Sequence, residues 1–445
     1  MLGIVAMAST SAYLTRYCIS AANTTIQRDL GFDEAQMGHL MSAFALGYLL
    51  CQVPGGWLGN RLGTRFVFTV VSIVWSLCNA GSAVATAFKV LWGSRFSLGI
   101  FQAGLVPLSA KIVSDWIPLP ARGLSSAMIA ASMSVGGAFA MWLTGCLLDQ
   151  NYGWRTIFVV YSVVGIVWSG GFYWYFRTFP KDHPAVNQAE LNLILGADTP
   201  GKSEKKSPAI GPDATEIESL PVNEPGEDGP DTVPVSGTAD RTLFVNMLKS
   251  PGMWAICIQS FFRAAGYAFF VTWFFAFLEY AYGINKAQAG ILNSLPLIGV
   301  IVGSVMGGII VDWLLRATGS RRVSRTGTAV VALTICGMLT MASAWTSSAV
   351  QLSAVIALGA LFSGISSPAA WAATIDIGGQ HTAIVMGVMN MVGGLAGVIL
   401  PILLGSWFKE IRETGGDWNS VIYLHAAFYF VGALSWLTVD PDRQV

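Results

Sequence analysis

The chain has 445 residues, of which 53% are hydrophobic and 11% charged, and its formal net charge at pH 7 is zero. Soluble domains carry about 25% charged residues, so this composition argues against a soluble protein, and zero net charge argues against a nucleic-acid partner. All six cysteines lie in apolar runs without the spacing of a metal site, so we expect no metal and no cofactor. The composition predicts an all-α polytopic membrane protein.

Twelve apolar segments are long enough to cross a bilayer core of about 30 Å, which takes about 20 helical residues. The first six lie near residues 2–22, 35–58, 66–86, 91–116, 124–147 and 154–177. The other six lie near residues 253–278, 288–313, 326–346, 350–374, 382–407 and 420–439. The sequence therefore predicts twelve transmembrane helices in two six-helix halves, 1–180 and 251–445.

The segment between the halves, 181–250, has a different composition. Residues 200–234 hold seven prolines among many acidic, glycine and serine residues, with few large apolar side chains. Such a composition cannot bury enough apolar surface to fold, so we expect a largely disordered cytoplasmic linker. With both chain termini in the cytoplasm, fifteen Lys and Arg residues lie on that side and six on the other, which favours this orientation. The membrane is expected to be a plasma membrane or a bacterial inner membrane.

An internal repeat relates the two halves. Shifted by 252 residues, GHLMSAFALGYLLCQVPGGWLGN (38–60) aligns without gaps with GILNSLPLIGVIVGSVMGGIIVD (290–312), and seven positions are identical. Both stretches are followed by a basic turn, at 61–65 and at 316–322. Two parallel repeats of six helices place a substrate site between the halves, near the middle of the membrane.

Several stretches resemble the major facilitator superfamily. GGWLGNRLGTR (55–65) is similar to the loop signature of that superfamily, and GGIIVDWLLRATGSRR (307–322) to its degenerate second copy. More narrowly, YLTRYCISAAN (13–23), RFSLGIFQAG (95–104) and GVMNMVGGLAGVILPILLG (387–405) resemble the anion:cation symporter family. That family includes bacterial sugar-acid and hexuronate symporters and the vesicular glutamate transporters and sialin.

The resemblance implies a loop motif that acts in conformational change. In this chain the motif comprises Gly55, Gly56, Asn60, Arg61, Gly63 and Arg65, with Asp312 and Arg316 in the second copy. The family signature has an aspartate at the position of Asn60, and that aspartate is thought to latch neighbouring helix ends. Asparagine keeps hydrogen bonds but carries no charge, so we expect a weaker latch.

Four basic residues lie inside predicted spans, and no acidic residue lies deep in one: Arg16, Arg95, Lys111 and Arg263. A charged side chain at a helix centre costs about 2.5–3.5 kcal/mol, so each needs a partner. Lys111 precedes Asp115 by one helical turn and can pair with it while reaching the membrane surface. For the arginines, backbone carbonyls or neutral side chains are one alternative, and a carboxylate of the substrate is the other.

The resemblance assigns several of these residues to a substrate site. Arg16 matches the first-helix arginine of the family, and Arg263 matches an arginine of the vesicular glutamate branch. The residues that match cavity positions of the sugar-acid symporters are Tyr13, Tyr48, Trp371 and Asn390, and Tyr267 lies one helical turn from Arg263. For each of these side chains, ordinary helix packing is the alternative role.

The coupling ion is constrained by two substitutions. In proton-coupled family members a glutamate at the Gln102 position pairs with the equivalent of Arg95, and an acid stands where this chain has Thr15. Gln102 lies seven residues after Arg95, near the same helix face, and can hydrogen-bond to it but cannot carry a proton. Proton symport is therefore disfavoured, and sodium coupling and anion exchange stay open.

The sequence thus predicts a secondary active transporter or facilitator of a small organic anion, a sugar acid or another carboxylate, that works by alternating access. The alternative is a transporter-like sensor that binds the anion without moving it. A channel is disfavoured because the repeat implies two alternating halves. We expect no enzyme activity, since the sequence has no nucleophile–base pair, metal cluster or phosphate loop.

Overall fold

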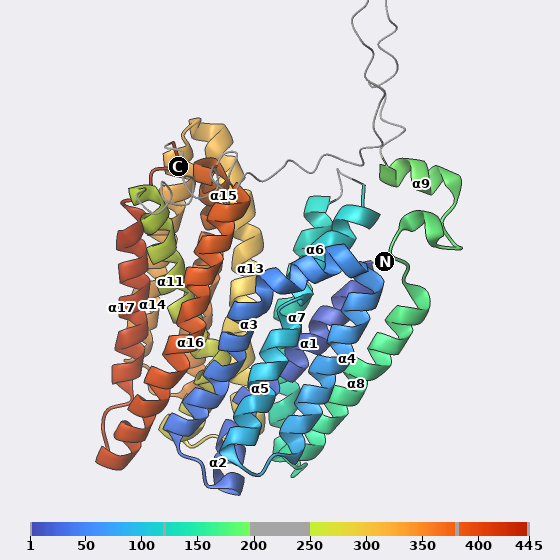
Figure 1. Cartoon of the computed structure of the whole chain (residues 1–445). Helices are drawn as coiled ribbons and strands as arrows, with labels where there is room; N and C mark the ends of the chain where they lie inside the picture. The colour runs from blue at the N-terminus through green and yellow to red at the C-terminus, as the bar shows by residue number, and fades with distance from the viewer. Residues whose placement is uncertain (1, 119–121, 196–249, 379–381, 443–445) are drawn as a thin grey trace, which may run out of the picture.

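The computed structural model describes residues 2–118, 122–195, 250–378 and 382–442. A few side chains within its helices are also outside the description, among them that of Asn60. The described residues are almost entirely helical, as the composition predicts, and the helices stand side by side in one bundle (Figure 1). Both ends of the drawn chain lie at one end of this bundle, which we call the termini end, and α2 lies at the other, the α2 end.

The first half contains a helix or a helix pair at each of the six predicted spans. These elements are α1 (Leu2–Ala21) with α2 (Asn23–Leu30), α3 (Glu34–Leu62), α4 (Thr64–Val84), α5 (Phe88–Gln102) with α6 (Leu105–Trp116), α7 (Arg122–Asp149) and α8 (Trp154–Tyr175). The fourth span is broken between α5 and α6. Pro107, in the first turn of α6, has no N–H group to offer the carbonyl of Ala103, so the helix cannot run through.

The second half follows the same order. Its elements are α11 (Pro251–Thr272) with α12 (Phe274–Tyr282), α13 (Lys286–Thr318), η3 (Val323–Gly327) with α14 (Thr328–Ser343), α15 (Ala349–Gly378), α16 (Thr382–Thr414) and α17 (Asn419–Trp436). Among the described residues, nine helical stretches are long and apolar enough to span a membrane, and α1, α3 and α17 complete the predicted twelve. The expected fold class is therefore confirmed.

The first residues of the predicted linker form regular structure. The described residues after α8 form a short 3₁₀ turn, η2 (Pro180–Asp182), and one further helix, α9 (Gln188–Leu195). The described part of the predicted linker, 181–195, is therefore partly helical, and the largely disordered character expected of 181–250 stays a prediction. Most of the predicted linker, 196–249, lies outside the described residues.

The two halves pack through α3 against α16 and through α7 against α13. Glycines bring these helices together. A Cβ atom on Gly38 would overlap the carbonyl oxygen of Pro401, and one on Gly145 would lie 2.5 Å from the carbonyl oxygen of Lys286. The backbones therefore touch directly at both crossings, as small residues allow in membrane helices.

Candidate functional site

A cavity of about 370 Å³ lies between the two halves. Its walls come from α1, α3, α5 and α6 on one side and from α11, α15 and α16 on the other. The polar and aromatic side chains that line it are those of Arg16, Tyr17, Ser20, Phe44, Tyr48, Gln52, Arg95, Tyr267, Thr272, Trp371 and Asn390. No carboxylate is among the described residues that line this cavity, so its wall is positively charged.

Arg16 projects from α1 into a ring of aromatic side chains. Its guanidinium carbon lies 5.3 and 5.5 Å from the ring centres of Tyr13 and Tyr17, and 4.6 and 5.2 Å from those of Phe44 and Tyr48. Each such contact contributes about 0.5–1 kcal/mol, or about 2 when desolvated. Within the described residues the guanidinium has no ion pair and no hydrogen bond. Its N–H groups therefore stay available to a ligand.

Arg95 finds its partners in the backbone of α1. Its two terminal nitrogens donate to the carbonyl oxygens of Thr15, at 3.0 Å, and of Arg16, at 2.8 Å. The side chain is only 1% exposed, and its Nε has no hydrogen-bond partner among the described residues. Of the two alternatives for the buried arginines, backbone carbonyls are therefore the one realised for Arg95. Because it holds the carbonyl of Arg16 itself, Arg95 fixes the backbone that carries the cavity cation.

Gln102 completes this clamp on α1. Its amide nitrogen donates to the carbonyl of Ala12 at 3.0 Å and to the hydroxyl of Thr15 at 2.9 Å. The hydrogen bond between Gln102 and Arg95 that the seven-residue spacing allows is replaced by these contacts. The two positions at which the family carries acids therefore bind each other through neutral groups.

Arg263 lies outside the residues that line the cavity. On α11 it is one helical turn before Tyr267, which does line it. Its guanidinium donates to the hydroxyl of Ser367 at 3.1 Å, and its Nε is buried without a partner among the described residues. The neutral side-chain partner is therefore the alternative realised for Arg263 in this conformation.

Of the other predicted site residues, four line the cavity and one lies behind its wall. Tyr48, Tyr267, Trp371 and Asn390 line the cavity, from α3, α11, α15 and α16. Tyr13 is not part of the wall but packs edge-on against Tyr17 beneath Arg16, with ring centres 5.4 Å apart. The sequence therefore indicated the aromatic and amide groups of both halves, although it did not single out Phe44, Tyr17 or Gln52.

The intramembrane lysine has the expected partner. The ammonium group of Lys111 lies 2.9 Å from a carboxylate oxygen of Asp115, one turn further along α6. Both residues lie at the termini end of α6, away from the central cavity. Lys111 is therefore not a candidate for substrate binding.

The loop motif lies at the termini end of the first half. Gly55 is on α3, Gly63 joins α3 to α4 with φ +84°, and Arg65 donates to the carbonyl of Tyr173 at 2.7 and 3.0 Å. The guanidinium of Arg61 lies over the ring of Trp57. The side chain of Asn60 lies outside the described structure, so the expected weaker latch stays a prediction.

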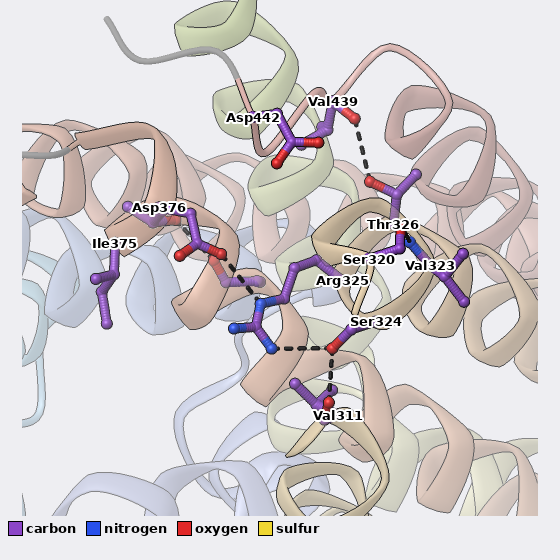
Figure 2. Close-up of polar contacts among 12 residues, drawn as sticks. Val311, Ser320, Val323, Ser324, Arg325, Thr326, Ile375, Asp376, Val439 and Asp442 are labelled. Atoms are coloured by element: carbon purple, nitrogen blue, oxygen red, sulfur yellow. Dashed lines mark hydrogen bonds and ion pairs between the residues drawn. The ribbon is translucent and has the colours of Figure 1, made fainter. Parts of the chain in front are cut away.

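The second copy of the motif has a different set of contacts. Arg316 donates weakly to the carbonyl of Asp312, at 3.3 Å. The ion pair in this region is instead that of Arg325 with Asp376, at 3.1 Å (Figure 2). Arg325 also donates to the hydroxyl of Ser324, at 2.9 Å. This pair was not predictable from the sequence, because 51 residues separate its members and both lie at predicted helix ends.

Two ion pairs join the halves at the α2 end. Asp33 pairs with Lys409 at 2.9 Å, and Glu34 pairs with Arg412. Asp33 also caps α3, since its carboxylate accepts a hydrogen bond from the N–H of Gln36. Partial burial opposes ionisation, but the hydrogen bonds from Gln36 and Lys409 outweigh it and lower the pKa of Asp33. This carboxylate is therefore ionised at neutral pH.

Two hydrogen bonds extend the same contact between α2 and α12. The hydroxyl of Thr24 donates to the carboxylate of Glu279 at 2.7 Å, and the hydroxyl of Tyr280 donates to the amide oxygen of Gln27 at 3.1 Å. We call these two hydrogen bonds and the two ion pairs the α2-end clamp. Within the described residues, the side-chain hydrogen bonds and ion pairs that join the two halves lie at the α2 end.

Two packed six-helix halves around a central charged cavity, joined by ion pairs at the α2 end, define a membrane transporter. Comparison of the whole sequence with known protein families leads to the same class. Residues 5–401 match the Major Facilitator Superfamily, and residues 256–445 match it a second time. The chain belongs to this superfamily and is a transporter rather than an enzyme.

Curated relatives of the chain are sugar-acid and organic-anion transporters. It is 26% identical to the probable sulfoacetate transporter SauU of Cupriavidus necator, over 99% of this chain and 93% of the relative. It is 27% identical to the D-galactonate transporter of Escherichia coli, over 97% and 92%. It is also 27% identical to the probable galactarate/D-glucarate transporter GudP of Escherichia coli, over 97% and 90%. The resemblance to the sugar-acid branch is thus confirmed.

Solved structures share the fold at lower identity. A bacterial homologue of the human lysosomal transporter Spinster, crystallised in an inward-facing and occupied conformation, has a TM-score of 0.68 and 16% identity, covering 98% of this chain and 93% of its own. The nucleoside transporter NupG has a TM-score of 0.66 and 14% identity, covering 98% and 99%. These likenesses establish the arrangement of the helices.

Proposed function

We propose that the chain transports a small organic anion and that Arg16 holds the anionic group of that substrate. The observation that carries the proposal is the guanidinium of Arg16 in a central cavity, without an ion pair or hydrogen bond among the described residues. A planar guanidinium suits a carboxylate or a sulfonate, because two parallel N–H groups can donate to two oxygens. A cation in the low-dielectric middle of a membrane is stabilised by such a partner.

The remaining wall suits a small hydroxylated body. The cavity volume of about 370 Å³ lies at the small end of ligand pockets, which span about 300–1,000 Å³. Ser20, Gln52, Thr272 and Asn390 offer hydroxyl and amide groups around it. The compounds named for the relatives, sulfoacetate, galactonate and galactarate or glucarate, are small organic anions. A sugar acid or another short carboxylate therefore fits both the charge and the size.

The proposed transport cycle follows from the position of the α2-end clamp. We infer that halves 1–180 and 251–445 move as two bodies joined by the linker 181–250, with both termini cytoplasmic in a plasma or bacterial inner membrane. In that orientation the α2-end clamp closes the cavity toward the outside. Breaking it while the termini end closes would expose the site to the other side. A sensor would need no such alternation, and the transporter relatives favour transport.

We infer that the coupling ion is not a proton carried by the usual acids of the family, because Thr15 and Gln102 occupy their positions and bind each other. Neither group titrates. Sodium coupling or anion exchange fits the site better, since the anion itself neutralises part of the charge of Arg16 and Arg95.

The test of the proposed site is ligand-dependent thermal stabilisation of the purified protein with sugar acids, short sulfonates and dicarboxylates. Arg16→Ala should weaken binding of the stabilising anion by at least about a hundredfold, because two charged hydrogen bonds are lost at about 1.5–3 kcal/mol each. Arg16→Lys should recover little, since a point charge replaces the fork. Gln150→Ala, outside the cavity, is the control. Full binding by Arg16→Ala would contradict the assignment.

A further inference from the structure

A second, larger cavity lies at the termini end of the first half, away from the central site. Its volume is about 650 Å³. The walls come from the turn between α3 and α4, the end of α6 and the segment that follows α8. The residues that line it are Gly59, Arg61, Leu62, Gly63, Thr64, Arg65, Lys111, Asp115, Arg177, Thr178, Phe179 and Asp182.

The charges in this cavity are predominantly positive. Four basic side chains face two carboxylates. One carboxylate, Asp115, is already paired with Lys111 at 2.9 Å, and the other, Asp182, is exposed. Three guanidiniums, those of Arg61, Arg65 and Arg177, therefore share the cavity with one solvated carboxylate. Asn60, between two of the lining residues, adds no charge where the family signature carries an aspartate.

The arginines are held in place but retain free donors. Arg65 donates through Nε and one terminal nitrogen to the carbonyl of Tyr173, at 3.0 and 2.7 Å. Arg177 donates through one nitrogen to the carbonyls of Trp174 and Phe176, at 2.9 and 3.0 Å. Each retains at least one guanidinium nitrogen without a partner in the described part of the chain. Among the described residues, the guanidinium of Arg61 contacts only the indole ring of Trp57.

The first turn of α4 adds donors of a second kind. Gly63 precedes this helix and provides no side-chain cap, so the first N–H groups of α4 have no capping partner there. Thr64 is fully buried, lines the cavity, and its hydroxyl has no hydrogen-bond partner among the described residues. Uncapped N–H groups, an unpartnered hydroxyl and guanidiniums together form the donor set that phosphate oxygens accept.

We infer that this cavity binds a phosphate group, carried by a phospholipid headgroup or by a soluble phosphate compound. The surroundings suit a lipid. Leu62, which lines the cavity, is exposed, and so are Phe66, next to Arg65, and Trp174, whose carbonyl accepts from Arg177; these side chains offer apolar surface to acyl chains. Basic pockets at helix ends bind anionic headgroups in this way. The site is distinct from the central cavity and does not depend on the proposed substrate.

The test compares two phosphate sources on the detergent-purified protein. Short-chain phosphatidylglycerol and inorganic phosphate are titrated separately, and binding is followed by thermal shift. The double substitution Arg61→Gln and Arg177→Gln should weaken binding roughly tenfold or more, because two charged donors are lost. Arg316→Gln with Arg322→Gln removes two exposed cations from the second half and should leave binding unchanged.

Thr64→Val is a second variant that keeps every charge and nearly the same volume, and it should weaken binding severalfold. Stabilisation by the lipid alone, lost in these variants, identifies a headgroup site. Stabilisation by phosphate with the same dependence on residues identifies a site for soluble phosphate compounds. The inference is overturned if neither probe binds, or if both bind equally well to the first-half double variant and to its second-half control.

Discussion

Breaking the pair of Glu34 with Arg412 should open the cavity at the α2 end. The side chain of Glu34 is only 6% exposed and that of Arg412 is 49% exposed. Exposed ion pairs contribute about 0–1 kcal/mol, whereas breaking one side of a buried pair costs about 3–5 kcal/mol. Because Arg412 keeps its contact with the ring of Tyr280, we expect about 1–2 kcal/mol for Glu34→Gln. The closed-to-open ratio then falls about 5- to 30-fold.

The assay is alkylation of a single cysteine introduced by Ser20→Cys. Ser20 is a cavity residue on α1 and is 3% exposed. The six native cysteines are replaced first, and a membrane-impermeant maleimide is added from the α2 side. Opening and closing are taken to be fast compared with alkylation, so that the rate follows the open fraction. Glu34→Gln should then raise the alkylation rate by the same 5- to 30-fold factor. Glu413→Gln is the matched control, since Glu413 is 65% exposed and contacts Lys409 within its own helix. Equal rates in both variants would refute the reasoning.

Three further predictions concern pH, the linker and the coupling ion. Since the pKa of Asp33 lies below its usual value, its pair with Lys409 stabilises the closed α2 end at neutral pH and is lost only as the pH falls below about 4. Because the thiolate is the species that reacts, the alkylation rate is divided by that of a free thiol at the same pH, and this ratio should be flat between about pH 6 and pH 8. Deleting residues 200–235 should leave uptake near normal, and a large loss at normal expression would mean that this segment contributes to transport. An acid-outside gradient at clamped voltage should not drive uphill uptake, and Gln102→Glu should introduce proton sensitivity; robust accumulation by the unmodified protein would contradict this.

The helices were predictable from sequence because each needs only an uninterrupted apolar run of sufficient length. The break before α6 is also encoded locally, by Pro107, although we expected one continuous span. The repeat correctly placed a cavity between the halves. Residue chemistry and family resemblance together indicated Arg16, Tyr48, Tyr267, Trp371 and Asn390, which all line it.

Partners distant in sequence were not predictable. Arg95 binds backbone carbonyls, and every residue has one, so no sequence pattern marks the acceptors. The clamp joins Asp33 to Lys409 across 376 residues, and a charge at a helix end looks the same whether or not it has a partner in the other half. Only the packing of the halves determines which charges meet.

Counterflow in proteoliposomes is the most direct test of the central claim, that the chain moves a small organic anion held by Arg16. The vesicles are loaded with the unlabelled anion that best stabilises the protein. They are then diluted into a solution that contains a trace of the labelled anion. The account predicts transient accumulation of label by the unmodified protein and about a hundredfold less by Arg16→Ala at the same protein density. Binding without any counterflow would identify a sensor, and full counterflow by Arg16→Ala would contradict the role assigned to this arginine.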